Sequence, residues 1–239
     1  MARLAAGRTT HLTKEEVAQA ALALFDDGDF SMRALGGRLG VSPAAIYNHF
    51  ENQGALVQAA VSLVWDESVT AFLAQIPDPV GQPGNPVEFL VVAAACARQA
   101  FGRHYRIATN LSLPPPESDS RLSGALAVFG SLLESAGVDG EDVGDAFYAY
   151  TTYTLGSILY RTYRRLASEH LGIDPEVALF SSASALPVDA PPVSPATLDG
   201  IDRTIAHTES DEQTEERQFE IGLRRLLEGF GLCGEAVQG

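Results

Sequence analysis

The chain has 239 residues, of which 46% are hydrophobic, so it is long enough for one or two domains with a sizeable core. Its net charge of −15 excludes a protein that attracts nucleic acid over its whole surface, because the part after residue 56 holds eleven basic and twenty-five acidic residues. The two cysteines, Cys96 and Cys233, exclude a disulfide framework and a cysteine-rich metal centre, and we expect both to be reduced thiols.

The first predicted helix begins after Thr13. Residues 13–16 read Thr-Lys-Glu-Glu, a capping box in which the Thr13 hydroxyl and the fourth residue's carboxylate satisfy free amides of the first helical turn. The apolar residues Val17, Ala21 and Leu24 follow on a single stripe. This spacing predicts a helix that buries one face against the elements that come next.

Two short helices that meet at a glycine turn are predicted over residues 31–50. In the first of them Met32, Leu35 and Leu39 recur at helical spacing, which gives the helix one buried face. Gly40 follows directly, at the position where a left-handed C-cap conformation costs glycine least. The chain is therefore expected to turn sharply after this helix.

The second of these helices leaves several side chains outside the core. Ser42 can cap it with a side-chain oxygen, and Pro43 fits its first position, where a missing N–H does no harm. Ile46 and Phe50, four residues apart, face inward. The side chains that point elsewhere are those of Ala44, Tyr47, Asn48 and His49.

A helix-turn-helix of this kind can place its second helix in the major groove of double-stranded DNA. Asn48 can hydrogen-bond a base edge, and Tyr47 or His49 can reach a phosphate or a base. The alternative is an ordinary pair of helices in a helical core. Upstream, Arg3 and Arg8 fit either a basic arm that enters a minor groove or a disordered start.

A long helix is expected next, capped by Asn52 and running until Pro77 stops it. Here the chain resembles the amino-terminal domain of the TetR family of transcriptional regulators. The features that carry the resemblance are the Gly-Val-Ser-Pro turn at residues 40–43 and then Tyr47, His49, Phe50, Asn52 and Leu56. The resemblance implies an all-α protein, with a three-helix DNA-binding domain over residues 1–56 and a helical ligand-binding and dimerisation domain over residues 57–239.

The predicted DNA-binding residues are Thr13, Arg33, Ser42, Pro43, Ala44, Tyr47, Asn48, His49 and Gln53. Family members usually carry lysine at the place of Gln53, which donates a hydrogen bond but releases no counterion. Residues 1–56 also hold five basic and six acidic residues. We therefore expect a modest affinity for DNA, and a ligand-binding or scaffolding protein of the same fold that has lost DNA binding stays open as the alternative.

The rest of the chain is predicted to consist of helices separated by proline-rich breaks. We expect these helices from Asn85 through Cys96, around Arg106 to Leu111, from Leu122 to Gly137, from Asp139 to about Leu171, and from Phe219 to Phe230. The segment from Ser181 to Gly200 contains four prolines and is predicted to be a mobile loop. No apolar run is expected to be long enough to cross a bilayer and no signal peptide is recognised, so we expect a cytoplasmic protein without membrane contact.

Two short phrases, Tyr153 to Gly156 and Phe219 to Leu223, resemble the tetracycline-repressor branch of the family. The resemblance implies that the central and last helices of the body pair with their symmetry mates in a homodimer. Gly222 and Gly229, seven residues apart, would permit a close approach of the partner's backbone. Packing of this stripe within one subunit is the alternative.

A helical body of this size can hold an apolar pocket with a few polar anchors, and a small-molecule effector is the expected partner. The predicted ligand-binding residues are Trp65, Phe72, Phe101, His104, Asn110, Phe147, Tyr148 and Thr151. Each of these aromatic side chains can equally be part of the core. Asn110 lies near the place of a histidine that holds drug-bound magnesium in tetracycline repressors, and it is a poor metal ligand. We therefore expect no metal and a mostly neutral effector that is aromatic or polyketide-like.

The sequence contains no nucleophile elbow, no glycine-rich phosphate loop, no zinc-protease motif and no paired cysteine ligands. We therefore expect neither an enzyme nor a cofactor, and no catalytic residue is predicted. The resemblance implies a two-state regulator, by default a repressor, which binds a palindromic operator as a homodimer and is released when the effector binds.

Overall fold

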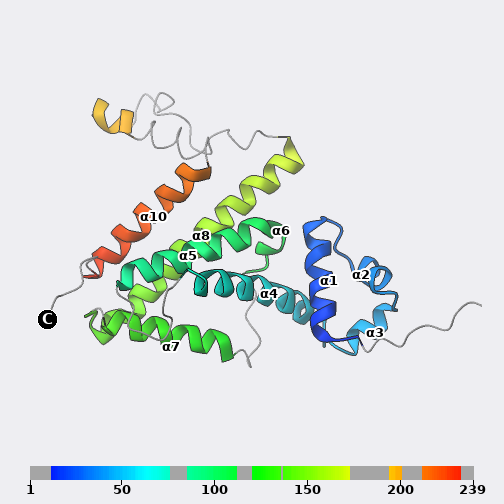
Figure 1. Ribbon diagram of the computed structural model, residues 1–239. Coiled ribbons are helices and arrows are strands. Elements are labelled where there is room, and N and C mark those ends of the chain that lie inside the picture. Colours follow the sequence, from blue (N-terminus) through cyan, green and yellow to red (C-terminus); the bar gives the residue numbers. More distant parts are fainter. Residues whose placement is uncertain are drawn as a thin grey trace, which may run out of the picture.

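The computed structural model describes residues 12–75, 85–111, 120–135, 137–172, 194–200 and 212–232. Within these ranges the chain forms helices and no strand, which confirms the predicted all-α class. Figure 1 shows a small group of helices, α1 to α3, at one end of the molecule, and α4 leads from this group into a larger helical part. We call residues 12–52 the head and the described residues from 53 onward the body.

The head contains α1 (Lys14–Asp26), α2 (Met32–Leu39) and α3 (Pro43–Tyr47). The predicted capping box is present, because the Glu16 amide donates to the Thr13 hydroxyl at 3.1 Å and the Thr13 amide donates to the Glu16 carboxylate at 2.8 Å. Ser42 caps α3 by accepting from the Ala45 amide at 3.3 Å. Gly40 ends α2 with φ of 69°, as predicted for a left-handed cap.

A further glycine in α2 sets the distance between the two helices of the turn. A Cβ atom on Gly36 would lie 2.7 Å from the Val41 carbonyl oxygen and 3.5 Å from Pro43. The Val41 amide also donates to the Gly36 carbonyl at 3.0 Å, so the two backbones are in direct contact. The sequence analysis did not single out this residue, although any larger side chain would push the start of α3 away from α2.

The long helix α4 spans Gln53–Leu73 and is capped by Asn52, whose side chain accepts from the Ala55 amide at 2.9 Å. The expectation that no apolar run is long enough to cross a bilayer is wrong, since α4 meets the requirement by length and by a mean hydropathy of 1.3. However, α4 packs against both α1 and α5, and Leu56, Ala60 and Val64 are fully buried. We therefore interpret α4 as a core helix.

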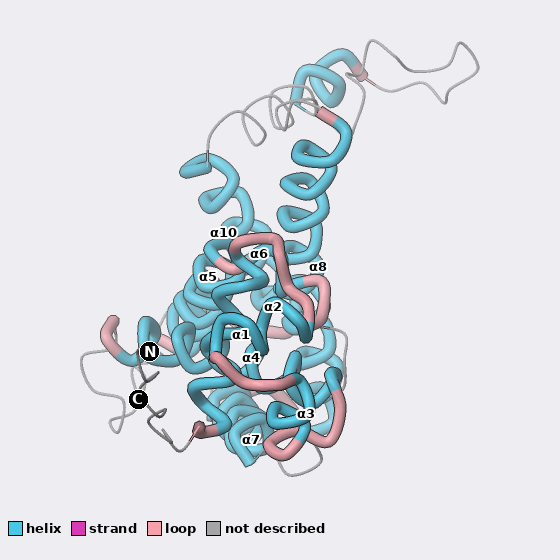
Figure 2. The backbone as a smooth tube through the Cα atoms, turned by 90° about the vertical axis from the view of Figure 1, so that its right-hand side faces the viewer, coloured by secondary structure: helices cyan, strands magenta, loops and turns pink. Residues whose placement is uncertain are grey.

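The other helices of the body are α5 (Pro86–Arg103), α6 (Tyr105–Ala108), α7 (Ser120–Ser135), α8 (Gly140–Leu171) and α10 (Glu212–Gly229). All the predicted segments overlap these helices, and capping residues such as Asn85 and Asp139 mark the predicted starts. However, α5 continues past Cys96 to Arg103, and α10 begins at Glu212, before Phe219. Helix α5 lies between α4 and the pair α8 and α10, and α7 packs on α8. Figure 2 looks along the molecule with the head in front of the body.

Two clusters of buried apolar side chains hold these helices together. The first contains Leu35 and Ile46 of the head together with Phe101, Ile107 and Ile158 of the body. The second lies wholly in the body and contains side chains such as Val91, Leu133 and Leu223. Because the first cluster is shared, the head packs directly on the body and is not a separate unit connected by a linker.

The predicted loop from Ser181 to Gly200 is partly wrong. Residues 195–200 form a short helix, and the Ser194 hydroxyl accepts from the Thr197 amide at 3.2 Å. A serine followed by a proline suits the start of a helix as well as a loop, which explains the error. Residues 181–193 lie outside the described residues, as do Arg3, Arg8, Pro77 and Cys233.

Candidate DNA-binding interface and effector site

Helix α3 is held by its inner face and exposes its outer face. Ile46 is fully buried and Phe50 is only 7% exposed, so both belong to the core, as predicted. In contrast, Tyr47 is 45% exposed, and Asn48 and Ala44 are also exposed. The predicted outward face of α3 is therefore the face that the structure leaves open.

The remaining predicted DNA-binding residues lie around α3 at the surface of the head. Ser42, Pro43, Arg33 and Gln53 are exposed, and Gln53 is the first residue of α4. His49 is half-buried. Thr13 is exposed, and its hydroxyl is already occupied because it accepts from the Glu16 amide and lies 3.0 Å from the Glu16 carboxylate.

The head carries no excess of positive charge, since residues 12–52 hold three basic and six acidic residues. Arg38 of α2 forms an exposed ion pair with Asp27 at 3.0 Å, so one of its few cations is paired with an acid. Hydrogen bonds from the Thr13 backbone and side chain lower the pKa of Glu16, which keeps a negative charge at the start of α1. The head therefore offers a DNA partner hydrogen-bonding groups on α3 and no strongly positive surface.

This geometry agrees with the comparison with protein families. Residues 17–60, which run from α1 into the first part of α4, match the profile described as bacterial regulatory proteins, tetR family. The helix-turn-helix of this chain is therefore similar to the DNA-binding domain of that family. The match covers the helix-turn-helix and leaves the greater part of the body outside it.

Solved structures of TetR-family proteins share the fold over almost the whole chain. The TetR-family protein ActR of Streptomyces coelicolor, in complex with (S)-DNPA, is 21% identical, covers 93% of this chain and 99% of its own, and has a TM-score of 0.63. A possible TetR-family regulator from S. coelicolor A3(2) is 21% identical, covers 91% of this chain and 98% of its own, and has a TM-score of 0.67.

TetR from Acinetobacter baumannii AYE is 23% identical, covers 92% of this chain and 97% of its own, and has a TM-score of 0.61. No curated protein matches the sequence. At these identities the likeness is one of fold. It shows that the head and the helical body together have the fold of these structures.

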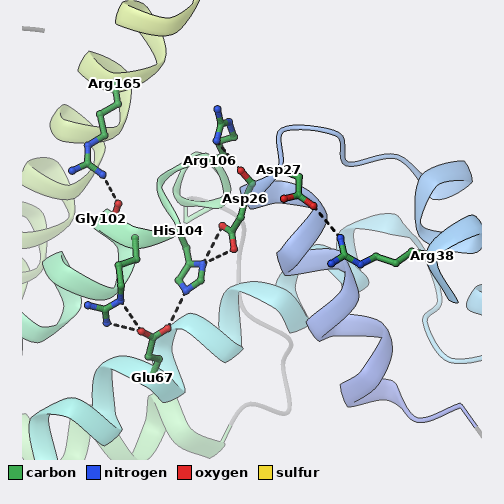
Figure 3. A network of polar contacts seen from close by, with 9 residues as sticks. Asp26, Asp27, Arg38, Glu67, Gly102, His104, Arg106 and Arg165 are labelled. Atoms are coloured by element: carbon green, nitrogen blue, oxygen red, sulfur yellow. Dashed lines mark hydrogen bonds and ion pairs between the residues drawn. The ribbon is translucent and has the colours of Figure 1, made fainter.

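A polar network joins the TetR-family head to the body (Figure 3). His104 lies between α5 and α6, and its Nδ1 is 2.9 Å from the Asp26 carboxylate at the end of α1. Its Nε2 is 3.0 Å from the Glu67 carboxylate on α4. Both ring nitrogens of His104 therefore face carboxylates, one from the head and one from the body.

Glu67 receives a second cation in this network. Arg103 Nε donates to its carboxylate at 2.8 Å. Burial alone would raise the pKa of Glu67, but hydrogen bonds and positive charge from Arg103 and His104 outweigh it and place the pKa below its usual range. Glu67 therefore stays ionised and anchors both basic side chains.

Arg106 of α6 makes a further contact with the head. It donates to the Asp26 carbonyl oxygen at 2.8 Å and to the Glu169 carboxylate of α8 at 2.8 Å. The Tyr105 hydroxyl donates to the same carboxylate, and this hydrogen bond, followed by the Arg106 charge, lowers the pKa of Glu169. The four-residue helix α6 thus connects α1 with α8.

The structure does not gather the eight predicted ligand-binding residues around one cavity. Trp65 packs edge-on against the buried Phe101, with ring centroids 4.9 Å apart, and Phe72 packs on Phe89. Tyr148 is 72% exposed, and Phe147 contacts Phe129 in the second cluster. His104 belongs to the network above. Asn110 donates to the Ile107 carbonyl at 3.2 Å, and Thr151 is half-buried.

A small recess between α5, α6 and α8 is filled almost completely by its own side chains and leaves no room for a water-sized molecule. Arg98, Arg161 and Arg165 line it, with the hydroxyl-bearing side chains Tyr105 and Thr162. Gly102 and Ile158 complete the lining. None of the eight predicted ligand-binding residues lines it. Sequence reasoning missed this group of arginines because Arg98 of α5 is far in the sequence from Arg161 and Arg165 of α8.

The back of this recess is an ion cluster that extends to α10. Arg98 is 2% exposed, and it contacts Glu216 at 3.1 Å and Glu215 at 3.3 Å. Arg161, which is 7% exposed, contacts the same two carboxylates, and its Nε lies 3.3 Å from Glu215. Buried arginines are costly unless they are paired, so this cluster fixes α10 on α5 and α8.

Proposed function

We propose that this protein is a ligand-responsive transcriptional regulator, by default a repressor, which binds a palindromic operator as a homodimer and is released by a small-molecule effector. The observation that supports this function best is the exposed outer face of α3 in a head that matches the TetR-family profile. We place the protein in the cytoplasm, where it would meet its operator. The effector-binding role of the predicted aromatic residues also remains a proposal.

In the proposed complex, α3 lies in the major groove and its outer side chains read the DNA. Asn48 would contact a base edge, while Tyr47 and the exposed Gln53 would donate to bases or phosphates. Arg33 would supply positive charge from α2. In a homodimer two such helices would meet successive major grooves on the same side of the duplex.

The network around His104 supports coupling between the body and the head. Asp26 belongs to the head, whereas Glu67, Arg103 and His104 belong to helices of the body. Any movement of α4 or α6 therefore acts on the end of α1. A coupling free energy of about 1–3 kcal/mol would change operator affinity roughly 5- to 150-fold.

The second candidate is a ligand-binding or scaffolding protein with the same fold that no longer binds DNA. Two observations favour it: Gln53 stands where the family usually has lysine, and the head holds no excess of basic residues. Its prediction is distinct, because such a protein would show no salt-dependent binding to any duplex.

The experiment that separates the two candidates is fluorescence anisotropy of the full-length protein against labelled duplexes that tile the DNA upstream of its own gene. Each duplex is titrated at two salt concentrations, with a scrambled duplex of equal length as the control. We expect one tile to bind more tightly than the scramble and to lose affinity as salt rises.

A matched pair of variants then locates the interface. Asn48→Ala removes a proposed base contact, and we expect its affinity for the bound tile to fall about tenfold, corresponding to the 1–3 kcal/mol of a good base contact. Gln19→Ala changes an exposed side chain of the same head on α1 and serves as the control. If the protein is folded and binds none of the duplexes, the second candidate function replaces the first.

A further inference from the structure

We propose that α3 reads A·T base pairs, with Asn48 hydrogen-bonded to an adenine and Ala44 packed on the C5-methyl group of a thymine. This inference rests on the regulator function proposed above and names the bases that the operator carries opposite α3. The helix lies on the side of the head away from the body, where a duplex can approach it (Figure 1).

Four side chains form the open face of α3. The exposed ones are Pro43, Ala44, Tyr47 and Asn48. Residues three and four apart lie side by side on a helix, and Asn48 keeps helical φ and ψ angles of −70° and −19°. The four side chains therefore point to the same side, while Ile46 is buried on the inner side and holds the helix in place.

The Asn48 side chain differs from the other asparagines of the protein. All four asparagines of the sequence are among the described residues, and Asn52 and Asn85 cap helices with their side-chain oxygens. Asn110 donates to the Ile107 carbonyl at 3.2 Å. In contrast, no described residue hydrogen-bonds the exposed side chain of Asn48. Both its amide oxygen and its amide NH₂ group can therefore pair with a base.

An asparagine amide matches adenine in the major groove. It donates to one atom of the base and accepts from another, as the N7 acceptor and the N6 donor of adenine require, whereas guanine offers two acceptors. The side chains that pair with both acceptors of guanine are arginine and lysine, and residues 39–52 contain neither. Asn48 therefore favours an A·T pair over a G·C pair at the position that it contacts.

Ala44 adds an apolar contact with the same preference. Thymine carries a C5-methyl group in the major groove, and alanine is one of the side chains that pack on it. Ala44 is exposed and lies four residues before Asn48, about one helical turn away. Helix α3 thus presents a methyl group and an amide group side by side, and both select A·T pairs.

The charge of the head makes these base contacts important. Residues 12–52 hold three basic residues, and one of them, Arg38, forms an ion pair with Asp27 at 3.0 Å. Such a head neutralises few phosphates, so the part of the affinity that is independent of DNA sequence is small. Discrimination between duplexes therefore depends on the contacts of α3 with the bases.

The first test selects duplexes from a random library with the natural full-length protein. We expect the enriched half-sites to contain invariant A·T pairs, and exchange of such a pair for G·C to lower the affinity about 5- to 150-fold in fluorescence anisotropy. Enriched half-sites in which only G·C pairs affect the affinity overturn the inference and leave the regulator function standing. If no duplex is enriched, the regulator function and this inference both fail.

The second test assigns the adenine to Asn48. 7-Deazaadenine lacks the N7 acceptor but keeps its pairing with thymine, and at one invariant A·T pair we expect it to lower the affinity of the natural protein about fivefold. Asn48→Ala should bind the two duplexes equally, because it has lost the same hydrogen bond. Gln19→Ala, the control on α1, should keep the fivefold preference. If Asn48→Ala also keeps it, Asn48 does not read the adenine.

The third test replaces thymine by uracil, which lacks only the C5-methyl group. The natural protein should bind the uracil duplex about fourfold more weakly, as the loss of one buried methyl group implies. Ala44→Gly should bind both duplexes equally, and a variant that still prefers thymine shows that Ala44 does not contact the methyl group. A thermal melt by circular dichroism checks the fold of each variant. If Ala44→Gly does not fold, the comparison with Asn48→Ala decides the inference.

Discussion

His104 is a single side chain that contacts both the head and the body. Its two ring nitrogens contact carboxylates from α1 and α4, and its own position lies between α5 and α6. Sequence reasoning selected His104 as a ligand contact because a histidine in a helical body is a common polar anchor. It could not reveal Asp26 as the partner, since the two residues are 78 positions apart.

At this residue we predict that His104→Gln lowers the free energy of unfolding by about 1 kcal/mol, because an amide group cannot contact the carboxylates of α1 and α4 from two sides as the imidazole ring does. The measurement is urea denaturation followed by circular dichroism. His170→Gln is the control, since His170 is exposed and its ring contacts the Leu166 carbonyl of its own helix. Equal effects of the two substitutions would contradict the prediction.

The pKa of Glu67 leads to a prediction about acid stability. A carboxyl group whose pKa is lower in the folded than in the unfolded state stabilises the protein above the unfolded pKa, and this stability is lost as the pH falls. For Glu67 the loss begins near the ordinary value of 4.5 and continues below it. We expect Glu67→Gln to be less stable than the natural protein at pH 7 and to lose less stability between about pH 5 and pH 3.5. The free energy of unfolding of both proteins is measured by urea denaturation across this pH range. If it falls equally in Glu67→Gln and in the natural protein, the prediction is wrong.

At the scale of elements, local signals were sufficient for most of the fold. The capping side chains of Thr13, Ser42, Asn52 and Asn85 hydrogen-bond within three residues of themselves, so the sequence alone places the helix starts. The exposed outer face of α3 also follows from helical spacing. The recess could not be predicted, because Arg98 and Arg161 meet only after α5 and α8 have packed, and no spacing rule connects them.

The turn of the head supplies a prediction with an internal control. Gly36→Ala places a Cβ atom 2.7 Å from the Val41 carbonyl, and we expect a loss of about 1–3 kcal/mol in the free energy of unfolding. Gly37→Ala has open space around the new Cβ atom and lies in the same helix, so it should stabilise the protein by about 0.5–1 kcal/mol. Urea denaturation of both variants measures the difference. A Gly36→Ala variant as stable as Gly37→Ala would show that α2 and α3 have room to separate.

At the scale of the whole molecule, the shared apolar cluster predicts that the head and the neighbouring part of the body unfold together. Leu35→Ala removes a fully buried side chain of the head and should cost about 2–5 kcal/mol. The only tryptophan, Trp65, lies in the body and contacts Phe101 of the same cluster.

We therefore expect Leu35→Ala to shift the midpoint of Trp65 fluorescence in urea to the same extent as the midpoint of circular dichroism. Val69→Ala, at a position of α4 that is 51% exposed, is the control and should shift neither. An unchanged fluorescence transition in Leu35→Ala, with a lower midpoint by circular dichroism, would show that the head unfolds independently.

The shared cluster also determines how the protein could be redesigned. A chimera that exchanges residues 1–56 with those of a relative would divide the buried cluster that contains Leu35, Ile46 and Phe101, and it would need a rebuilt core before it could fold. Grafting only the exposed side chains of α3 leaves that packing intact, since Ile46 alone of its five residues is buried. Engineered operator preferences are therefore more readily obtained by resurfacing a single turn than by exchanging whole domains.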